Sequence, residues 1–159
     1  MRKLPILALC LTIALASCQK SSIPPDANSL NSSTSSDALT NRYYLTAHTW
    51  MYNKYYIGYI DSTHKGKLQY RRGGSTNLII LDNTRDTYFK DNTETEIDEN
   101  GNTIPATWHF TNELRTKYVV TNYTGSYHIT IVRLDNKHFN WYYTDIHGVK
   151  RYGEEIPAN

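Results

Sequence analysis

The chain has 159 residues, of which 39% are hydrophobic and 13% aromatic, including 14 tyrosines. This composition fits one globular domain with some accessory sequence and excludes a collagenous or fully disordered chain. The formal net charge is +2, and 15 basic residues remain against 15 acidic ones once Arg2 and Lys3 are assigned to a removed segment. A near-neutral mature chain argues against a nucleic-acid partner that is bound through a strong basic field.

Residues 1–17 have the pattern of a secretory signal peptide: two basic residues, an apolar run over 4–15 and small residues at the end. The run is shorter than the roughly 20 residues that a membrane-spanning helix needs. Leu15-Ala16-Ser17-Cys18 resembles the lipobox of bacterial lipoproteins, in which the cysteine thiol is acylated and becomes the first mature residue. The alternative is an ordinary signal peptide in which Cys18 is incidental. We expect lipidation at Cys18. Gln19 stands where lipoproteins retained at the inner membrane typically have aspartate, so the resemblance implies the outer membrane and leaves the face of that membrane open.

Residues 18–36 are rich in Ser, Asn and Pro, and we expect them to form a flexible tether that begins at the lipidated cysteine. Cys10 lies in the signal peptide and Cys18 carries the lipid, so the domain expected over 37–159 has no cysteine. It therefore contains neither a disulfide nor a thiol nucleophile.

The segment Asp37–Ala47 is the only helix candidate, because Leu39, Tyr43 and Ala47 are spaced by four and would share one face. The rest of the chain has the alternation and turn spacing of short strands. The expected strands are Trp50–Ile60, Lys67–Arg71, Thr76–Leu81, Asp86–Lys90, Thr93–Glu99, Asn102–Thr111, Lys117–Asn122, Ser126–Arg133, His138–Thr144 and Val149–Ile156. Sequential hairpins predict an all-β fold, an antiparallel up-and-down β-barrel of about eight strands after a short N-terminal helix.

Asn100-Gly101 predicts a two-residue type I′ turn between two of these strands. That turn pairs Ile97 with Ile104 and places Glu94 and Glu96 on the opposite, solvated face, together with Asp98. Further on, a two-residue turn at Asp135-Asn136 would put the apolar residues of its two strands on opposite faces. We therefore expect a bulge or a three-residue loop there.

The domain resembles the small lipocalin-like lipoproteins of Bacteroidota over about residues 37–157. The resemblance depends on the lipobox and tether, the helix ending in Leu45-Thr46-Ala47-His48-Thr49-Trp50, the acidic hairpin 95–101 and the step Ala106-Thr107-Trp108-His109-Phe110. His48 and Ala106 stand where lipocalins proper have the glycine of Gly-x-Trp. The resemblance implies a barrel and a small hydrophobic ligand at its mouth, and no binding residue is carried over.

The residue types give little sign of catalysis or metal binding. The six histidines lack close His-x-His or His-x-x-x-His spacing, and solvated surface histidines are the better interpretation. Glu94, Glu96, Asp98 and Glu99 could form a weak calcium site, but a solvated face is favoured. Glu154 and Glu155 would point to opposite faces of a strand, so they cannot form a glycosidase pair. We expect no enzyme activity, no catalytic residues and no cofactor.

The aromatic excess is the main candidate for function. Alternation assigns Trp50, Trp108, Trp141, Phe110 and Phe139 to the core. The tyrosines are too many for the core alone, although tyrosine also fits a pleated surface for structural reasons. The candidate ligand-binding residues are Tyr52, Tyr56, Tyr118, Tyr127 and Tyr143.

The sequence thus favours an outer-membrane-anchored lipocalin-like lipoprotein that binds a small apolar or amphipathic ligand. Its partners would be the membrane, through the lipid on Cys18, and that ligand or an envelope protein. The alternative is a structural or interaction module of an envelope assembly, with a narrow barrel that its own side chains fill. Three inward-pointing tryptophans would favour this alternative because they leave little space.

Overall fold

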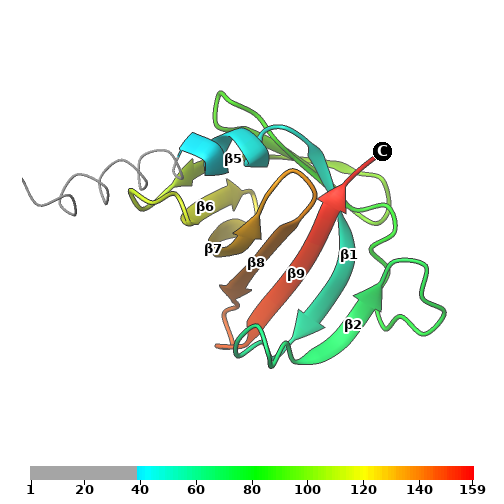
Figure 1. The fold of residues 1–159 in the computed structure, drawn as a ribbon. Coiled ribbons are helices and arrows are strands. Elements are labelled where there is room, and N and C mark those ends of the chain that lie inside the picture. The colour runs from blue at the N-terminus through cyan, green and yellow to red at the C-terminus, as the bar shows by residue number, and fades with distance from the viewer. Residues whose placement is uncertain (1–38) are drawn as a thin grey trace, which may run out of the picture.

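The computed structural model describes residues 39–159, and the expected signal peptide (1–17), Cys18 and the tether (18–36) lie outside them. A helix that ends at residue 45 precedes nine strands (Figure 1). The strands are β1 (Thr49–Ile57), β2 (Lys67–Arg71), β3 (Arg85–Tyr88), β4 (Thr93–Ile97), β5 (Thr103–Phe110), β6 (Lys117–Asn122), β7 (Gly125–Leu134), β8 (Phe139–Thr144) and β9 (Lys150–Pro157).

Eight of these strands form a closed antiparallel barrel, which confirms the predicted fold. β1 pairs with β3, each later strand pairs with the next, and β9 returns to β1. β2 is an extra strand, since it pairs with the C-terminal half of β1 on the same edge that β3 uses at the N-terminal half. Arg72 binds the stretch of β1 between the part that pairs with β3 and the part that pairs with β2. Its backbone N donates to Asn53 O at 2.9 Å and its Nε donates to Tyr52 O at 2.7 Å.

The expected strand Thr76–Leu81 is wrong, because this segment belongs to the loop between β2 and β3. Asn77 holds the loop in shape: its Oδ1 accepts from Arg71 N at 2.8 Å and its Nδ2 donates to Arg71 O at 3.0 Å. Leu78 and Ile80 are exposed. Local side-chain bonds of this kind compete with strand pairing, and here they override the apolar run.

The N-terminal helix lies at one end of the barrel (Figure 1). Leu45 is fully buried there, and its carbonyl accepts a hydrogen bond from Trp50 Nε1 at 3.0 Å. The expected apolar face was wrong, because Leu39 and Tyr43 are both 63% exposed and Ala47 is also exposed. The buried Leu45 in the last turn anchors the helix, whereas the residues spaced by four do not.

The barrel core is aromatic, as predicted. Trp50, Trp108, Phe139 and Trp141 are buried, and Phe110 packs against them half-buried. The expected irregularity between the strands near Asp135 is confirmed as a register shift between Ile131 and Arg133. This bulge restores the inward orientation, so the apolar residues of β7 and β8 face the same interior.

The β4–β5 hairpin has a different register from the predicted one. Asp98 N donates to Asn102 O at 3.0 Å and Gly101 N donates to Asp98 O at 3.0 Å, so three residues rather than two form the loop. Glu96 therefore lies opposite Ile104, and Glu94 lies opposite Ala106. A one-residue change reverses the faces of a strand, which turns Glu94 and Glu96 into the barrel.

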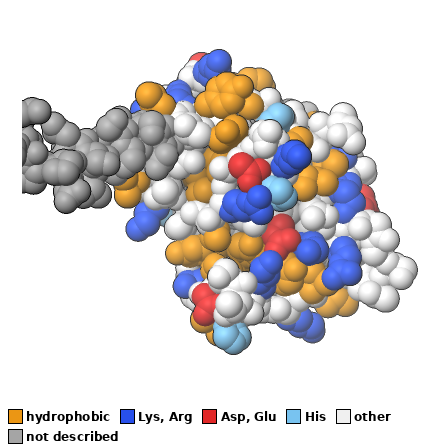
Figure 2. Space-filling view, viewed as in Figure 1, with side chains coloured by type: hydrophobic (Ala, Val, Ile, Leu, Met, Phe, Trp, Pro, Cys, Tyr) orange, Lys and Arg blue, Asp and Glu red, His pale blue; other side chains and the backbone are white. Residues whose placement is uncertain are grey.

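The outer surface mixes charges of both signs with apolar groups. Figure 2 shows basic, acidic and apolar side chains interspersed over the face that includes β1 and β9. Glu154 forms ion pairs on this side with Lys65 at 2.6 Å and Lys54 at 3.4 Å. The surface thus agrees with the near-neutral charge of the expected mature chain.

Candidate functional site

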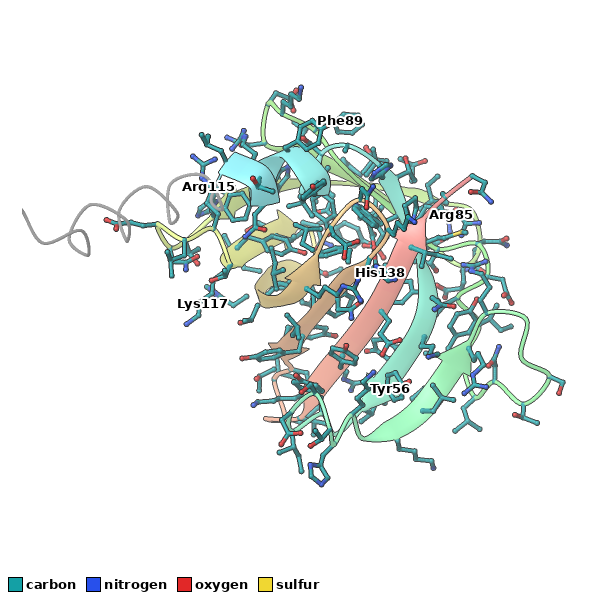
Figure 3. All side chains as sticks on the ribbon, in the orientation of Figure 1. Tyr56, Arg85, Phe89, Arg115, Lys117 and His138 are labelled. Atoms are coloured by element: carbon teal, nitrogen blue, oxygen red, sulfur yellow. The ribbon has the colours of Figure 1, made fainter. Side chains whose placement is uncertain are left out.

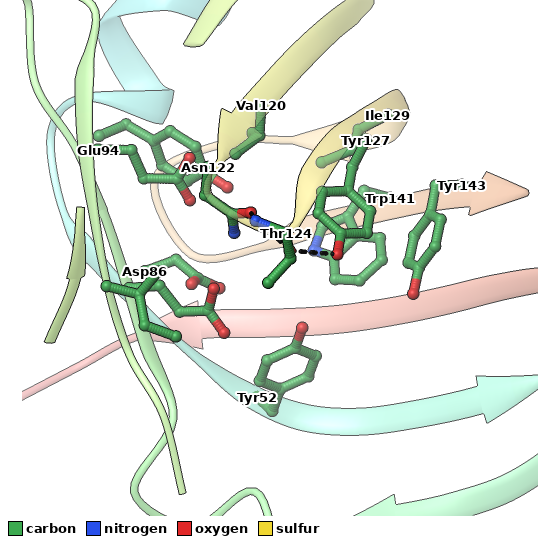
Figure 4. Close-up of a pocket in the computed structure, with 13 residues that line it drawn as sticks. Tyr52, Asp86, Glu94, Val120, Asn122, Thr124, Tyr127, Ile129, Trp141 and Tyr143 are labelled. Atoms are coloured by element: carbon green, nitrogen blue, oxygen red, sulfur yellow. Dashed lines mark hydrogen bonds between the residues drawn. The ribbon is translucent and has the colours of Figure 1, made fainter. Parts of the chain in front are cut away.

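A cavity of about 330 Å³ lies inside the barrel, towards the end opposite the helix. Thirteen residues from β1, β3, β4, β5, β6, β7, β8 and the β6–β7 turn line it (Figure 4). The turn residue Thr124 is exposed, so the cavity reaches solvent at this end. The three core tryptophans point inward without filling this part of the interior.

Acidic side chains form one wall of the cavity. Asp86 on β3 lies directly opposite Glu96 on β4, and Glu94 is two residues away on the same face of β4. Glu94 is only 5% exposed, and its Oε2 has no hydrogen-bond partner. None of the thirteen lining residues is Lys, Arg or His. This wall therefore has carboxyl groups with no basic side chain beside them in the cavity.

A fourth carboxyl is buried close to this wall. Glu155 on β9 lies opposite Tyr52 on β1, is 1% exposed, and accepts a hydrogen bond from Trp141 Nε1 on Oε1 at 2.6 Å. Its Oε2 has no partner. Its neighbour Glu154 bonds to lysines on the outer surface, so the two point to opposite faces, as strand alternation predicts.

Burial and nearby acidic groups raise the pKa values of these four carboxyl groups. Burial, and then the nearby Glu96, raises the pKa of Asp86 to about 8. Burial, and then Asp86 and Glu96, raises the pKa of Glu94 to about 9. Burial is also the main cause that raises the pKa of Glu96 and, far more strongly, the pKa of Glu155. At neutral pH the carboxyl groups of Asp86 and Glu94 are thus protonated and uncharged in the empty cavity.

Aromatic rings form the opposite wall (Figure 4). The Trp141 ring stacks on that of Tyr143 at 5.9 Å and meets that of Tyr52 edge-on at 6.0 Å. The Tyr127 and Tyr143 rings are 5.7 Å apart, also edge-on. Ile129 lies beside them. This wall offers apolar ring faces together with phenol hydroxyls.

Polar side chains order the mouth of the cavity. Asn122 Oδ1 accepts hydrogen bonds from Thr124 N at 2.9 Å and Thr124 Oγ1 at 2.6 Å. Thr124 Oγ1 also lies 2.8 Å from the Tyr127 hydroxyl (Figure 4). These bonds connect the β6–β7 turn to the aromatic wall, so the mouth and the wall are positioned together.

The five tyrosines predicted as binding residues lie in three different environments. Tyr52, Tyr127 and Tyr143 line the cavity. Tyr118 is buried in the core, where its hydroxyl lies 3.2 Å from that of Tyr88. Tyr56 lies on the outer surface (Figure 3), where its ring packs against Tyr152 at 5.8 Å. The structure therefore brings three of the five together, and Tyr56 does not contribute to the cavity.

Sequence reasoning missed the acidic wall. It assigned Glu94 and Glu96 to a solvated face, an assignment that the hairpin register overturns. A signal was present: Asp98-Glu99-Asn100-Gly101 has the Asp and Gly preferred at the first and last positions of a type I turn, which belongs to a three-residue hairpin loop. For Asp86 the signal is strand alternation. Asp86 and Tyr88 are two residues apart in one strand, so both side chains point to the same face.

The described residues offer no metal site. Within residues 39–159, no group of three or more His, Cys, Asp or Glu side chains is arranged to hold a metal ion. His109 and His128 are exposed, and His138 Nδ1 lies 3.0 Å from Asp135 Oδ1. Asp98, considered as a calcium ligand, instead caps its own turn by accepting from Asn100 N and Asn102 N.

No protein-family model matches the chain, and neither a curated protein nor a solved structure matches it. The class of protein is therefore defined by the fold alone, as a closed eight-stranded antiparallel barrel with an internal cavity. Over the part of the chain that the structure describes, no helix is long and apolar enough to cross a membrane.

Proposed function

We propose that this protein is a non-enzymatic binding protein that holds a small amphipathic molecule inside its barrel. The cavity carries this proposal: its volume of about 330 Å³ lies within the range of small-molecule sites, roughly 300–1,000 Å³. Its two walls differ in character, because one has aromatic rings and the other has carboxyl groups. A molecule with an apolar body and one polar end matches both walls.

An interaction module of an envelope assembly is the second candidate. Apolar side chains at the mouth end of the barrel favour it, because Tyr123 is 80% and Ile146 96% exposed on the turns β6–β7 and β8–β9. The cavity favours the binding function, since a module that works only through its surface has no use for an unfilled interior with buried polar groups.

We further propose that lipid on Cys18 attaches the protein to the outer membrane, as a member of the lipocalin-like lipoproteins. The lipobox-like sequence Leu15-Ala16-Ser17-Cys18 supports the anchor. Two or three acyl chains, as in bacterial lipoproteins, hold a protein at a membrane far more firmly than one. The barrel would then present its ligand close to a membrane surface.

Native mass spectrometry of the protein purified from the membranes of its own host tests the binding function. We expect a reproducible added mass of a small organic molecule, lost in a variant whose cavity is filled by Val120→Trp. Val132→Trp, which adds the same ring at an exposed position of β7, is the matched control and retains the added mass. A clean unliganded mass in the wild-type protein would favour the interaction module instead.

A further inference from the structure

We infer that the ligand is an organic cation, a small amphipathic amine whose ammonium group is held by the carboxyl groups of Asp86, Glu94 and Glu96. This inference rests on the proposed binding function and specifies the chemical class of the molecule bound at the same site. Three observations carry it: the convergence of the acids, the donor missing from one of them, and the position of the aromatic rings.

The acids converge because of the strand register. Asp86 and Glu96 are directly opposed across β3 and β4, and Glu94 follows on the same face, so all three border one cavity. No Lys, Arg or His lines that cavity. On the outer surface, by contrast, Glu154 is paired with two lysines. The inner acids thus lack the positive partner that buried charges ordinarily have in proteins.

Glu94 has an acceptor that nothing in the described structure satisfies. Its Oε2 is buried and has no hydrogen-bond partner, and a buried polar atom left in this state costs free energy. The Tyr88 hydroxyl, which bonds to that of Tyr118, also interacts with the Glu94 carboxyl and lowers its pKa, but Oε2 still has no partner. An ammonium group has three N–H donors and no acceptor, which suits a wall of carboxyl oxygens. A carboxylate ligand would add more acceptors to the same wall.

The rings facing the acids suit the remainder of such a molecule. Tyr52 and Trp141 lie across the cavity from the acidic wall, with Ile129 near them (Figure 4). Aromatic faces attract cations and also pack against apolar chains. An amine can therefore place its ammonium group against the carboxyl groups and its body against the rings.

Binding would be coupled to proton release. The titratable groups that face Glu94 come from four strands: Asp86 and Tyr88 on β3, Glu96 on β4, Tyr118 on β6 and Glu155 on β9. None of them is a cation, and burial together with repulsion from the neighbouring acids keeps Asp86 and Glu94 protonated when the cavity is empty. When an ammonium group enters, one carboxyl gives its proton to the buffer and an N⁺–H···O⁻ bond forms.

Isothermal titration calorimetry on the full chain at pH 8 tests the inference with three probes that share one apolar body: n-octylamine, 1-octanol and octanoate. We expect the amine to bind at least about tenfold more tightly than the other two, as one charge-assisted hydrogen bond predicts. Repeating the titration in two buffers of different ionisation enthalpy should show protons released by the amine alone.

The variant Glu94→Gln should weaken octylamine binding about tenfold or more and leave octanol binding unchanged. Glu113→Gln, at an exposed position between β5 and β6, is the matched control and should bind like the wild type. Near-ultraviolet circular dichroism shows whether Glu94→Gln folds. If it does not, Asp86→Asn provides a second test.

Tighter binding of octanol or octanoate than of octylamine would overturn the cation inference while supporting a ligand in the cavity. Absence of octylamine binding would also overturn it. In either case the proposed binding function is tested independently, by native mass spectrometry of the protein purified from its host.

Discussion

Trp108 shows how single residues hold this barrel together. It is 1% exposed, and its Nε1 donates to Thr93 O at 2.9 Å and to Phe89 O at 3.2 Å. Its ring meets that of Tyr88 edge-on at 5.8 Å. One side chain thus fills the core and fixes the chain on both sides of the β3–β4 connection.

Trp108→Ala should lower the free energy of unfolding by about 3–5 kcal/mol, because the substitution empties a large buried volume and removes an indole donor. Urea titration monitored by circular dichroism measures this change. A loss below about 1 kcal/mol would place Trp108 outside the core.

Gly153 is required by a close approach rather than by its backbone angles. A Cβ atom built on Gly153 would lie 2.6 Å from Trp141 Cε2 and Cζ2. Gly153→Ala should therefore destabilise the protein by about 1–3 kcal/mol, the range for overpacking. In a Trp141→Leu background the same substitution should have a smaller effect, which a double-mutant cycle measures. An equal effect in both backgrounds would contradict the contact.

Among the strands, the alternation of apolar residues and the chemistry of the turns determine different features of the fold. Strand β6 was predicted with its observed bounds, Lys117–Asn122, because polar residues stand at both ends of its apolar centre. The segment 76–81 was mistaken for a strand because its apolar run is as strong as a real one. The bonds between Asn77 and Arg71, and that from Leu78 N to Gln69 O, hold it as a loop beside β2. Periodicity identified strands, whereas side-chain bonds decided their limits and register.

The acidic wall depends on one turn. Asn100-Gly101 favours a two-residue loop when taken alone, but Asp98 accepts two backbone N–H bonds and Gly101 has a φ of +84°, which produces the three-residue loop. Most of the fold was therefore predictable from alternation. The acidic wall was not, because Glu94 and Glu96 change face with a single step in register.

Thr95→Glu tests this register. Thr95 lies on the outer face of β4, so the substitution should change the free energy of unfolding by no more than about 0.5 kcal/mol. Thr103→Glu, at an exposed position of β5, is the control. In the two-residue register Thr95 would face the core, and a loss above about 2 kcal/mol in urea titration would indicate that arrangement.

At the scale of the whole molecule, the buried carboxyl groups make stability depend on pH. Asp86 and Glu94 have pKa values raised from 3.8 and 4.5 to about 8 and about 9, so the folded state binds more protons than the unfolded state between these limits. The contribution of these groups to the free energy of unfolding is fully present below about pH 4 and is lost as the pH rises towards 9.

The free energy of unfolding of the empty protein should therefore fall by at least about 2 kcal/mol between pH 5.5 and pH 8.5. Urea titrations at the two pH values measure the difference. Glu94→Gln should reduce it, since a glutamine has no proton to lose, and Glu113→Gln, at an exposed position between β5 and β6, should leave it unchanged. A wild-type protein that is more stable at pH 8.5 would contradict the buried acids.

The membrane anchor is also a property of the whole chain. Cys18→Ala should move the protein from the membrane fraction to the soluble fraction, because the acylated thiol is lost. Fractionation of host cells followed by immunoblotting measures this. Membrane association that persists in the variant would contradict lipidation at Cys18.

A carboxyl-detected NMR titration of the full chain tests whether the barrel encloses a cavity with an acidic wall. Carbon-13 labels in Asp and Glu side chains, assigned with Asp86→Asn and Glu94→Gln, report each carboxyl group separately. We predict titration of Asp86 near pH 8 and of Glu94 near pH 9. Titration of both near pH 4, as for solvated carboxyl groups, would place them in solvent outside the barrel and exclude an acidic cavity wall.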